Sequence, residues 1–482
     1  MKRSARAMIL LVTVAALVAV SVSCEPEIVE EPFEPATSHD EYRRALELLD
    51  LDETALGTAW ISSGERALTE PLQVEMPFEE VVLLDPHNPH AVGYEFVAER
   101  GRAVTVSIET EVDRYYADLF RVEDESNVVM VASRPSDSSE IRFEPRRDGR
   151  YLLRVQPELL RGGRIVVRIV ATASLAFPVE GVGPGQILSF FGDGRDGGLR
   201  MHEGVDIFAP RGTPLLAASD ALVHRVGVRD RGGNIVSLYD EKRDLLLYYA
   251  HLEDQTVREG DRVTAGQIIG TVGNTGNAIT TPPHLHIGVY QGSWRNAVDP
   301  WNYFVDPPLT DPEPARYEDL VGSWARPARD AMLRAVAEAP VVRPRWTNRN
   351  PLLRLEGAGD GRTDGRTDGG SGPSEMTPVA PPVRDASGVG PVKADTPLLV
   401  VGASGSLVRV RMPGGAEGYV DPSYLAGSGE AYTLERSQTL REPVSGDGFR
   451  RLAAGGMVEY LGRYGARVYV RTGDGRVGFI DA

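Results

Sequence analysis

The sequence predicts a mainly β, multidomain protein. Its 482 residues exceed the roughly 100–200 residues of one domain, so several folded units are expected. Short runs of β-branched residues separated by turn signals recur along the chain, and the C-terminal part contains an internal sequence repeat. Hydrophobic residues make up 41% of the chain, enough for buried cores. The net charge of −17 argues against nucleic acid as a partner and against electrostatic docking on anionic lipid.

The N-terminus is typical of an export signal. Basic residues precede an apolar run, 8–22, that is too short to span a membrane. Cys24, the only cysteine, follows small residues, and this segment resembles a bacterial lipoprotein processing site, although Ser21 stands where leucine is usual. The resemblance implies a lipoprotein signal peptide over 1–23 and a lipid anchor on Cys24. The alternative is ordinary cleavage after Ser23, but a lone cysteine in an exported chain is easier to explain as an anchor.

Three segments follow the signal before the middle of the chain. Residues 24–38 are acidic and proline-bearing, which predicts a flexible tether. Residues 39–69 contain a short helical segment. Residues 70–175 carry short β-rich runs, a pattern typical of a β-sandwich. Within them, 143–155 resembles the jelly-roll modules appended to secreted peptidases, and with no catalytic constellation in view we interpret this region as a spacer or binding module.

Residue types that bind a metal ion occur in three short segments. These are His202-Glu203-Gly204-Val205-Asp206, Tyr249-Ala250-His251 and His284-Leu285-His286. A catalytic zinc site needs three nitrogen or oxygen ligands and an open position for water, and a nearby histidine can handle protons. An isolated His-x-His pair is more often structural, but four of the eight histidines fall in these segments, which predicts a metal site. The others are interpreted as solvated or structural: His39, His87, His90 and His224.

Local geometry separates this pattern from the helical His-Glu-x-x-His site. His284 and His286 alternate with apolar residues, so in a strand both imidazoles lie on one face. In a straight strand His202 and Asp206 would lie about 13 Å apart, too far to share an ion, so the chain must bend between them. Gly204 permits such a bend and disfavours a helix.

On these residues the chain resembles the lysostaphin-type (LytM) zinc metallopeptidase family, from about residue 186 to 306. The motifs that carry the resemblance are Ser189-Phe190-Phe191-Gly192, Arg200-Met201-His202-Glu203-Gly204-Val205-Asp206-Ile207, Ala209-Pro210-Arg211-Gly212-Thr213-Pro214, Tyr249-Ala250-His251-Leu252, Gly273-Asn274-Thr275-Gly276, His284-Leu285-His286 and Val298-Asp299-Pro300. The resemblance implies an antiparallel β peptidase domain, placed here at 176–306.

The same resemblance implies roles for five side chains. His202, Asp206 and His286 would bind Zn²⁺, and His251 and His284 would lie beside the metal-bound water. Either of these two histidines could take the proton, stabilise the oxyanion or protonate the leaving amine, and the sequence does not divide the roles. Every required position is filled, unlike in family members that have lost ligands and act as non-catalytic activators.

Residues 257–267 also resemble the hairpin of a biotinyl or lipoyl carrier domain. Such carriers need a lysine at the hairpin tip for modification. The chain's lysines are Lys2, Lys242 and Lys393. None lies between the two strands, so a carrier function is excluded.

The remainder of the chain is divided into three parts. Apolar residues at helical spacing predict a helical extension over 307–340. Residues 341–395, rich in Gly, Asp, Pro and Ser, are interpreted as a low-complexity linker or long insertion. Residues 396–482 contain two copies of a strand, glycine turn and aromatic strand, at 407–421 and 467–481, which resemble paired bacterial SH3-like barrels. These repeats would bind wall peptide or glycan, or else serve a structural or protein-docking role.

Together these features predict a lipid-anchored zinc endopeptidase that cuts peptide cross-links of peptidoglycan. A lipoprotein under an outer membrane, facing the periplasm, would meet cross-links between D-alanine and a diamino acid, which favours a D,D-endopeptidase by family analogy. The alternative is a non-catalytic envelope scaffold or activator of another wall hydrolase. A protein regulator that relieves autoinhibition is kept open as a partner.

Overall fold

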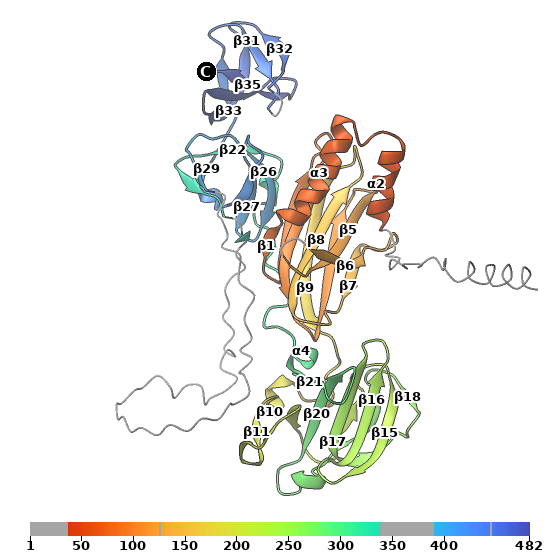
Figure 1. Cartoon of the computed structure of the whole chain (residues 1–482). Helices are drawn as coiled ribbons and strands as arrows, with labels where there is room; N and C mark the ends of the chain where they lie inside the picture. Colours follow the sequence, from red (N-terminus) through yellow and green to blue (C-terminus); the bar gives the residue numbers. More distant parts are fainter. Residues whose placement is uncertain (1–36, 125–126, 335, 338–389, 444–445) are drawn as a thin grey trace, which may run out of the picture. The chain divides into compact units, whose positions relative to one another are not determined.

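The computed structural model describes residues 37–124, 127–334, 336–337, 390–443 and 446–482 (Figure 1). The predicted signal peptide, Cys24, most of the tether and most of the 341–395 linker lie outside these residues. Among the described residues, no helix is both long and apolar enough to cross a membrane. Strands predominate over helices and fall into several sheets, which confirms the prediction of a mainly β chain.

The chain divides into two units, residues 1–45 and 46–482. In the first unit, Thr37 caps the start of helix α2 (Ser38–Leu48), because its hydroxyl accepts a hydrogen bond from the Asp40 amide at 3.0 Å. The Asp40 carboxylate accepts one from the Thr37 amide in return, at 3.2 Å. Helix α3 (Ala55–Thr69) belongs to the second unit and is capped by Thr54.

Residues 72–173 form nine strands that belong to two sheets. Their bounds are β1 (Leu72–Val74), β2 (Phe78–Leu84), β3 (Val92–Ala98), β4 (Arg102–Thr110), β5 (Tyr115–Val122), β6 (Val128–Ser133), β7 (Glu140–Phe143), β8 (Gly149–Pro157) and β9 (Gly163–Ala173). One sheet contains β1-β3-β8-β5-β6, and the other contains β2-β9-β4-β7. Side chains from both sheets meet in one hydrophobic core. The β-sandwich assignment of this region stays a prediction.

A ten-stranded antiparallel sheet carries the candidate site. Its main path runs β10-β13-β20-β17-β16-β15-β18. The bounds are β10 (Ile187–Ser189), β13 (Val205–Phe208), β14 (Pro214–Leu216), β15 (Ala221–Arg229), β16 (Gly233–Asp240), β17 (Leu245–Gln255), β18 (Arg262–Val263), β19 (Ile268–Val272), β20 (His284–Gln291) and β21 (Ala297–Val298). Leu285, Ile287 and Val289 of β20 are fully buried in the core, so the alternation turns His284 and His286 to the opposite face.

The predicted helical extension over 307–340 is wrong. The described part of this segment contains a 3₁₀ turn, η4 (Glu318–Leu320), and three short strands, β22 (Trp324–Pro327), β23 (Ala331–Met332) and β24 (Val336–Ala337). Ala325 and Leu333 are buried in a core shared with Leu398 and Val400 of a later strand. The apolar spacing therefore reflects burial against partners distant in sequence, which local periodicity cannot distinguish from a helical stripe in so short a segment.

The C-terminal part forms two groups of strands. The first comprises β25 (Pro391–Val392), β26 (Leu398–Ser404), β27 (Leu407–Arg411), β28 (Glu417–Val420) and β29 (Leu425–Gly427). The second comprises β30 (Glu430–Thr433), β31 (Gln438–Arg441), β32 (Gly448–Leu452), β33 (Met457–Tyr464), β34 (Arg467–Arg471) and β35 (Val477–Asp481). The two copies of the internal sequence repeat form matching hairpins. Val410 pairs with Gly418 in the first hairpin, and Val470 pairs with Gly478 in the second. The SH3-like assignment stays a prediction.

The two C-terminal groups differ in their sheet partners. Strand β26 pairs with β2, so that β28-β27-β26-β2-β9-β4-β7 form one continuous path of hydrogen-bonded strands. Strand β22, which precedes the predicted linker, also pairs with β26. The first repeat therefore includes residues from both sides of the linker segment and shares a sheet with the N-terminal strands. Strands β30–β35 form a separate six-stranded sheet.

Candidate metal centre

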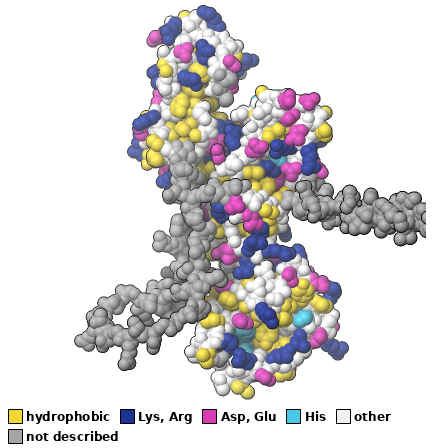
Figure 2. Space-filling model, in the orientation of Figure 1, with side chains coloured by type: hydrophobic (Ala, Val, Ile, Leu, Met, Phe, Trp, Pro, Cys, Tyr) yellow, Lys and Arg dark blue, Asp and Glu magenta, His cyan; other side chains and the backbone are white. Residues whose placement is uncertain are grey.

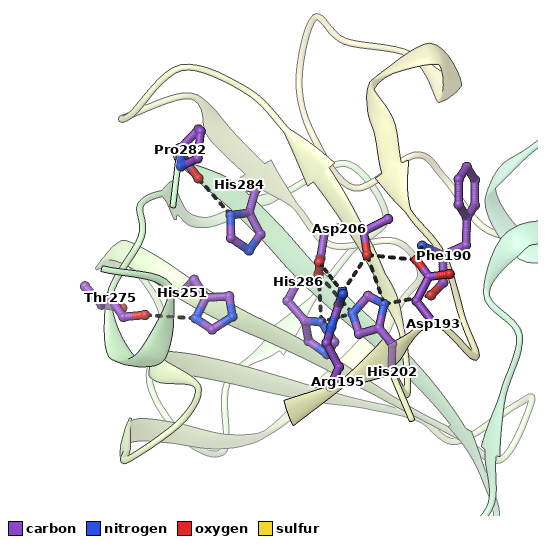
Figure 3. Close-up of polar contacts among 11 residues, drawn as sticks. Phe190, Asp193, Arg195, His202, Asp206, His251, Thr275, Pro282, His284 and His286 are labelled. Atoms are coloured by element: carbon purple, nitrogen blue, oxygen red, sulfur yellow. Dashed lines mark hydrogen bonds and ion pairs between the residues drawn. The ribbon is translucent and has the colours of Figure 1, made fainter. Parts of the chain in front are cut away.

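Three of the predicted site residues converge on one point. His202 Nε2 lies 3.0 Å from Asp206 Oδ1 and 2.9 Å from His286 Nδ1 (Figure 3). His286 Nδ1 also lies 3.0 Å from Asp206 Oδ1. Their ligand atoms all lie within 4.8 Å of one another, close enough for the three residues to hold one metal ion. The donor set of two imidazole nitrogens and one carboxylate oxygen is that of a catalytic zinc site.

Strand register explains how residues so far apart in sequence meet. Strands β13 and β20 are antiparallel neighbours in which Asp206 lies directly opposite His286. His202 precedes β13, and the chain bends at Gly204 to bring it back toward Asp206. A Cβ atom at this glycine would lie 2.4 Å from the Ile287 carbonyl oxygen and 2.8 Å from His286 Cε1. The glycine thus allows the bend and a close approach to β20.

Groups outside the cluster orient its members. His202 Nδ1 donates a hydrogen bond to the Phe190 carbonyl oxygen at 2.8 Å, which leaves the Nε2 lone pair directed at the cluster. Arg195 Nη2 lies 2.9 Å from Asp206 Oδ2, so the second carboxylate oxygen is also held. Arg195 was missed in the sequence analysis, because it appears in the sequence only as a single basic residue in a glycine-rich segment. The Phe190 carbonyl was also missed, because a backbone group cannot be recognised from the sequence.

The other two predicted histidines lie together beside this cluster (Figure 3). The ring centroids of His251 and His284 are 5.1 Å apart, and that of His251 is 6.0 Å from His286. His251 Nδ1 donates to the Thr275 carbonyl oxygen at 2.8 Å, and His284 Nδ1 donates to the Pro282 carbonyl oxygen at 2.9 Å. In the neutral imidazole each Nε2 is then unprotonated and available as a base.

The backbone of His251 adopts an uncommon conformation. Its φ is +66°, in the left-handed region that few residues other than glycine occupy. The His251 amide donates to the Gly232 carbonyl oxygen at 2.8 Å, which helps to hold this conformation. Such conformations cost about 1–3 kcal/mol and cluster at functional sites.

Burial and neighbouring groups shift the pKa values of three side chains at the site. Desolvation lowers the pKa of His251 to about 4, although its hydrogen bond to the Thr275 carbonyl acts in the opposite direction. Desolvation also lowers the pKa of His286. For Asp206, burial acts to raise the pKa, but the nearby rings of His202 and His286 outweigh it and hold the pKa well below its usual value. Near pH 7 Asp206 is therefore a carboxylate and His286 a neutral imidazole, the forms that coordinate a metal, and His251 is neutral and able to accept a proton.

Comparison with known proteins identifies the domain that holds this site. Residues 200–300 match the model of Peptidase family M23. The chain is 40% identical over 90 residues to the peptidoglycan DD-endopeptidase ShyC of Vibrio cholerae, spanning 19% of this chain and 20% of that protein. It is 36% identical over 138 residues to an L-Ala–D-Glu endopeptidase of Bacillus subtilis, spanning 27% and 40%. It is also 40% identical over 109 residues to the lipoprotein YgeR of Escherichia coli, spanning 22% and 40%.

These matches cover a fifth to two fifths of each relative's length, so they concern one domain rather than whole proteins. Peptidases of this family are zinc-dependent, in agreement with the cluster of His202, Asp206 and His286. The two histidines beside the cluster lie within the matched residues as well. The chain therefore contains a peptidase family M23 domain of the LytM type.

Proposed function

We propose that this protein is a zinc-dependent endopeptidase that hydrolyses peptide cross-links of peptidoglycan. The observation that carries the proposal is the convergence of His202, Asp206 and His286, with two further histidines beside them whose Nδ1 atoms contact backbone carbonyl oxygens. Bound zinc would polarise the scissile carbonyl and lower the pKa of its bound water toward about 7. Metal-assisted amide hydrolysis needs both a ligand set and a base, and this face of the sheet supplies both.

The chain's own residues would divide the remaining work. His251 Nε2 or His284 Nε2 accepts the proton from the attacking water and later donates it to the leaving amine. The carbonyl acceptors Thr275 O and Pro282 O fix the ring orientations, so neither imidazole must reorient during the reaction. Arg195 and the Phe190 carbonyl hold Asp206 and His202 in place. We expect general acid–base catalysis by such a histidine to contribute about 10²- to 10⁴-fold.

For the scissile bond we propose the D,D cross-link between D-alanine and a diamino acid. The support is the similarity to a relative described as a peptidoglycan DD-endopeptidase. A second relative of similar identity is described as cleaving the L-Ala–D-Glu bond, which makes that bond the alternative product to look for.

For location we propose lipidation of Cys24 and attachment to the periplasmic face of the outer membrane. The support is the sequence around Cys24 and the similarity of the peptidase domain to a lipoprotein. We further propose that the β-sandwich and the SH3-like repeats position the catalytic domain on the wall.

The test is mass spectrometry of fragments released from purified sacculi by the full chain lacking residues 1–23, with and without added zinc. New peptide ends that require zinc and are absent from the His284→Ala variant would support the enzyme and name its bond. A chain that binds zinc but releases nothing, with or without envelope extract, would overturn the enzyme and favour a non-catalytic scaffold.

A further inference from the structure

A row of aromatic rings leads away from the metal cluster along the same face of the sheet. The ring of Tyr248 lies 6.1 Å from the ring of His286, and the ring of Trp294 lies 6.1 Å from that of Tyr248. Tyr290 and His224 flank Trp294 at 5.1 and 6.2 Å. The aromatic platform, defined as Trp294 with Tyr248, Tyr290 and His224, is therefore continuous with the candidate metal centre.

Strand register places these rings on the face that carries the ligands. His286, Gly288 and Tyr290 alternate along β20 and so share one face, and Tyr248 of β17 lies directly opposite Gly288. A Cβ atom at Gly288 would lie 2.9 Å from Tyr290 Cε2, so the glycine leaves room for the ring. Figure 2 shows apolar side chains, with histidine beside them, on the visible face of the body built from β10–β21.

Trp294 is exposed and yet held in position. Its relative exposure is 42%, which is unusual for the largest apolar side chain. The loop that carries it is closed by a hydrogen bond from the Gln291 amide to the Asn296 carbonyl oxygen at 3.0 Å. The Gly292 amide donates to the Asp244 carbonyl oxygen at 3.0 Å, which ties the loop to the neighbouring hairpin. A rigid, exposed aromatic ring beside a catalytic cluster is the form of a ligand-binding surface.

The distance from the metal cluster indicates what would reach this ring. Two ring spacings of 6.1 Å place Trp294 at most about 12 Å from the His286 ring. An extended peptide rises about 3.3–3.6 Å per residue, so at most three to four residues fit in this span. In peptidoglycan a stem peptide of a few residues joins the cross-link to a muramyl sugar through its N-terminus. With the cross-link at the metal, the sugar end of the stem reaches the platform.

We propose that Trp294 and its neighbours bind a sugar ring of the glycan strand, an N-acetylhexosamine, while the stem peptide extends to the metal. The C–H face of a pyranose is apolar and stacks on an aromatic ring, and its equatorial polar groups remain in water or meet the hydroxyl and imidazole groups at the platform's edge. This proposal rests on the proposed function, because it assumes that peptidoglycan is the substrate.

The first experiment compares two substrates of the full chain lacking residues 1–23. One is a cross-linked muropeptide that retains its disaccharides, and the other is the same peptide after enzymatic removal of the sugars. We expect kcat/KM to favour the sugar-bearing substrate by about five- to tenfold, the size of one aromatic stacking contact. Trp294→Ala should bring this ratio close to one, and Trp294→Phe should give an intermediate value.

The matched control is Tyr317→Ala, which removes a ring of 37% exposure that lies outside both the sheet of the candidate site and the predicted repeats. It should leave the ratio unchanged. Equal losses on both substrates in Trp294→Ala would show a peptide-binding role and overturn the proposal, and so would a wild-type ratio of one.

A second experiment separates this proposal from the enzymatic one. Binding of peptide-free glycan strands is followed by tryptophan fluorescence in wild type and in Trp294→Ala. Binding that requires Trp294, without any cleavage of sacculi, would contradict the proposed enzymatic function and support sugar binding by the aromatic platform. Cleavage of sacculi with no binding signal from Trp294 would mean the opposite.

Discussion

Glu80 and Arg409, 329 positions apart in sequence, form an ion pair inside the protein. Arg409 Nη1 lies 3.0 Å from Glu80 Oε2, and their side chains are 1% and 0% exposed. The hydroxyls of Tyr94 and Tyr419 also donate to the Glu80 carboxylate, at 2.6 and 2.9 Å. The pair lies where strand β26 joins strand β2, so it links the first C-terminal repeat to the N-terminal strands.

Breaking this pair should destabilise both regions. Burial raises the pKa of Glu80, and the charge of Arg409 acts against that rise, so Arg409→Met leaves a buried carboxylate without its cation. We expect a loss of about 3–5 kcal/mol in the free energy of unfolding. The measurement is urea unfolding of the full chain, with hydrogen exchange of the β2 and β27 amides. The double variant Glu80→Gln/Arg409→Met should recover more than half of the loss, and no recovery would contradict this account.

The same neighbourhood should make stability depend on pH. Desolvation lowers the pKa of His90 to about 4, although Glu417, 3.4 Å away, acts to raise it, and the cations of Arg66, Arg409 and Arg411 lower it further. The folded pKa lies below the unfolded value of about 6.5, so the unfolded chain binds the proton more readily. Stability should therefore be full above pH 6.5 and fall as the pH is lowered toward 4.

We expect the loss from His90 by pH 5 to be about 2 kcal/mol, because this pH lies about 1.5 units below the unfolded pKa. Urea unfolding at pH 7.5 and pH 5 measures it. His90→Asn should reduce the dependence between these two values without abolishing it, because the lowered pKa values of His251 and His286 act in the same direction. The acid form of Glu417, whose pKa is lowered to about 2, adds a separate loss only as the pH falls from about 4.5 through 2.

The bend at Gly204 should be required for metal binding. In Gly204→Ala the added methyl group meets the Ile287 carbonyl oxygen and the His286 ring, so β13 and β20 must separate or His202 must move. We expect zinc affinity to fall by at least tenfold in a competition titration with a chelating dye. Gly227→Ala on β15 is the control, because nothing lies within 4 Å of its added Cβ. Unchanged affinity in Gly204→Ala would refute the role of the bend.

The two roles at the site, metal ligand and proton acceptor, should separate experimentally. Asp206→Ala removes a ligand and should lose bound zinc together with activity. His251→Ala should retain about one zinc per chain and still lose about 10²- to 10⁴-fold in kcat, because it removes a base rather than a ligand. Elemental analysis of the purified variants beside cleavage of sacculi makes the comparison. Loss of zinc in His251→Ala would place that residue among the ligands instead.

The sequence alone determined the chemistry of the site. The side-chain types at positions 202, 206 and 286 fix which atoms can bind a metal, and the two-residue alternation of β20 fixes that His284 and His286 share a face. Gly204 was expected to bend the chain, and the close approach to Ile287 agrees with that expectation. The shared face of His284 and His286 and the bend at Gly204 could be predicted because strand periodicity and the conformational freedom of glycine are local properties.

The tertiary structure decided what depends on partners distant in sequence. Segment 324–327 is a strand rather than part of a helix because β26 supplies its hydrogen bonds. The orientation of His202 depends on the Phe190 carbonyl, a backbone group present in every residue. Glu80 and Arg409 are ordinary surface residue types that become buried only when their strands join one sheet. Burial and backbone pairing are properties of the assembled fold, and no local window of sequence contains them.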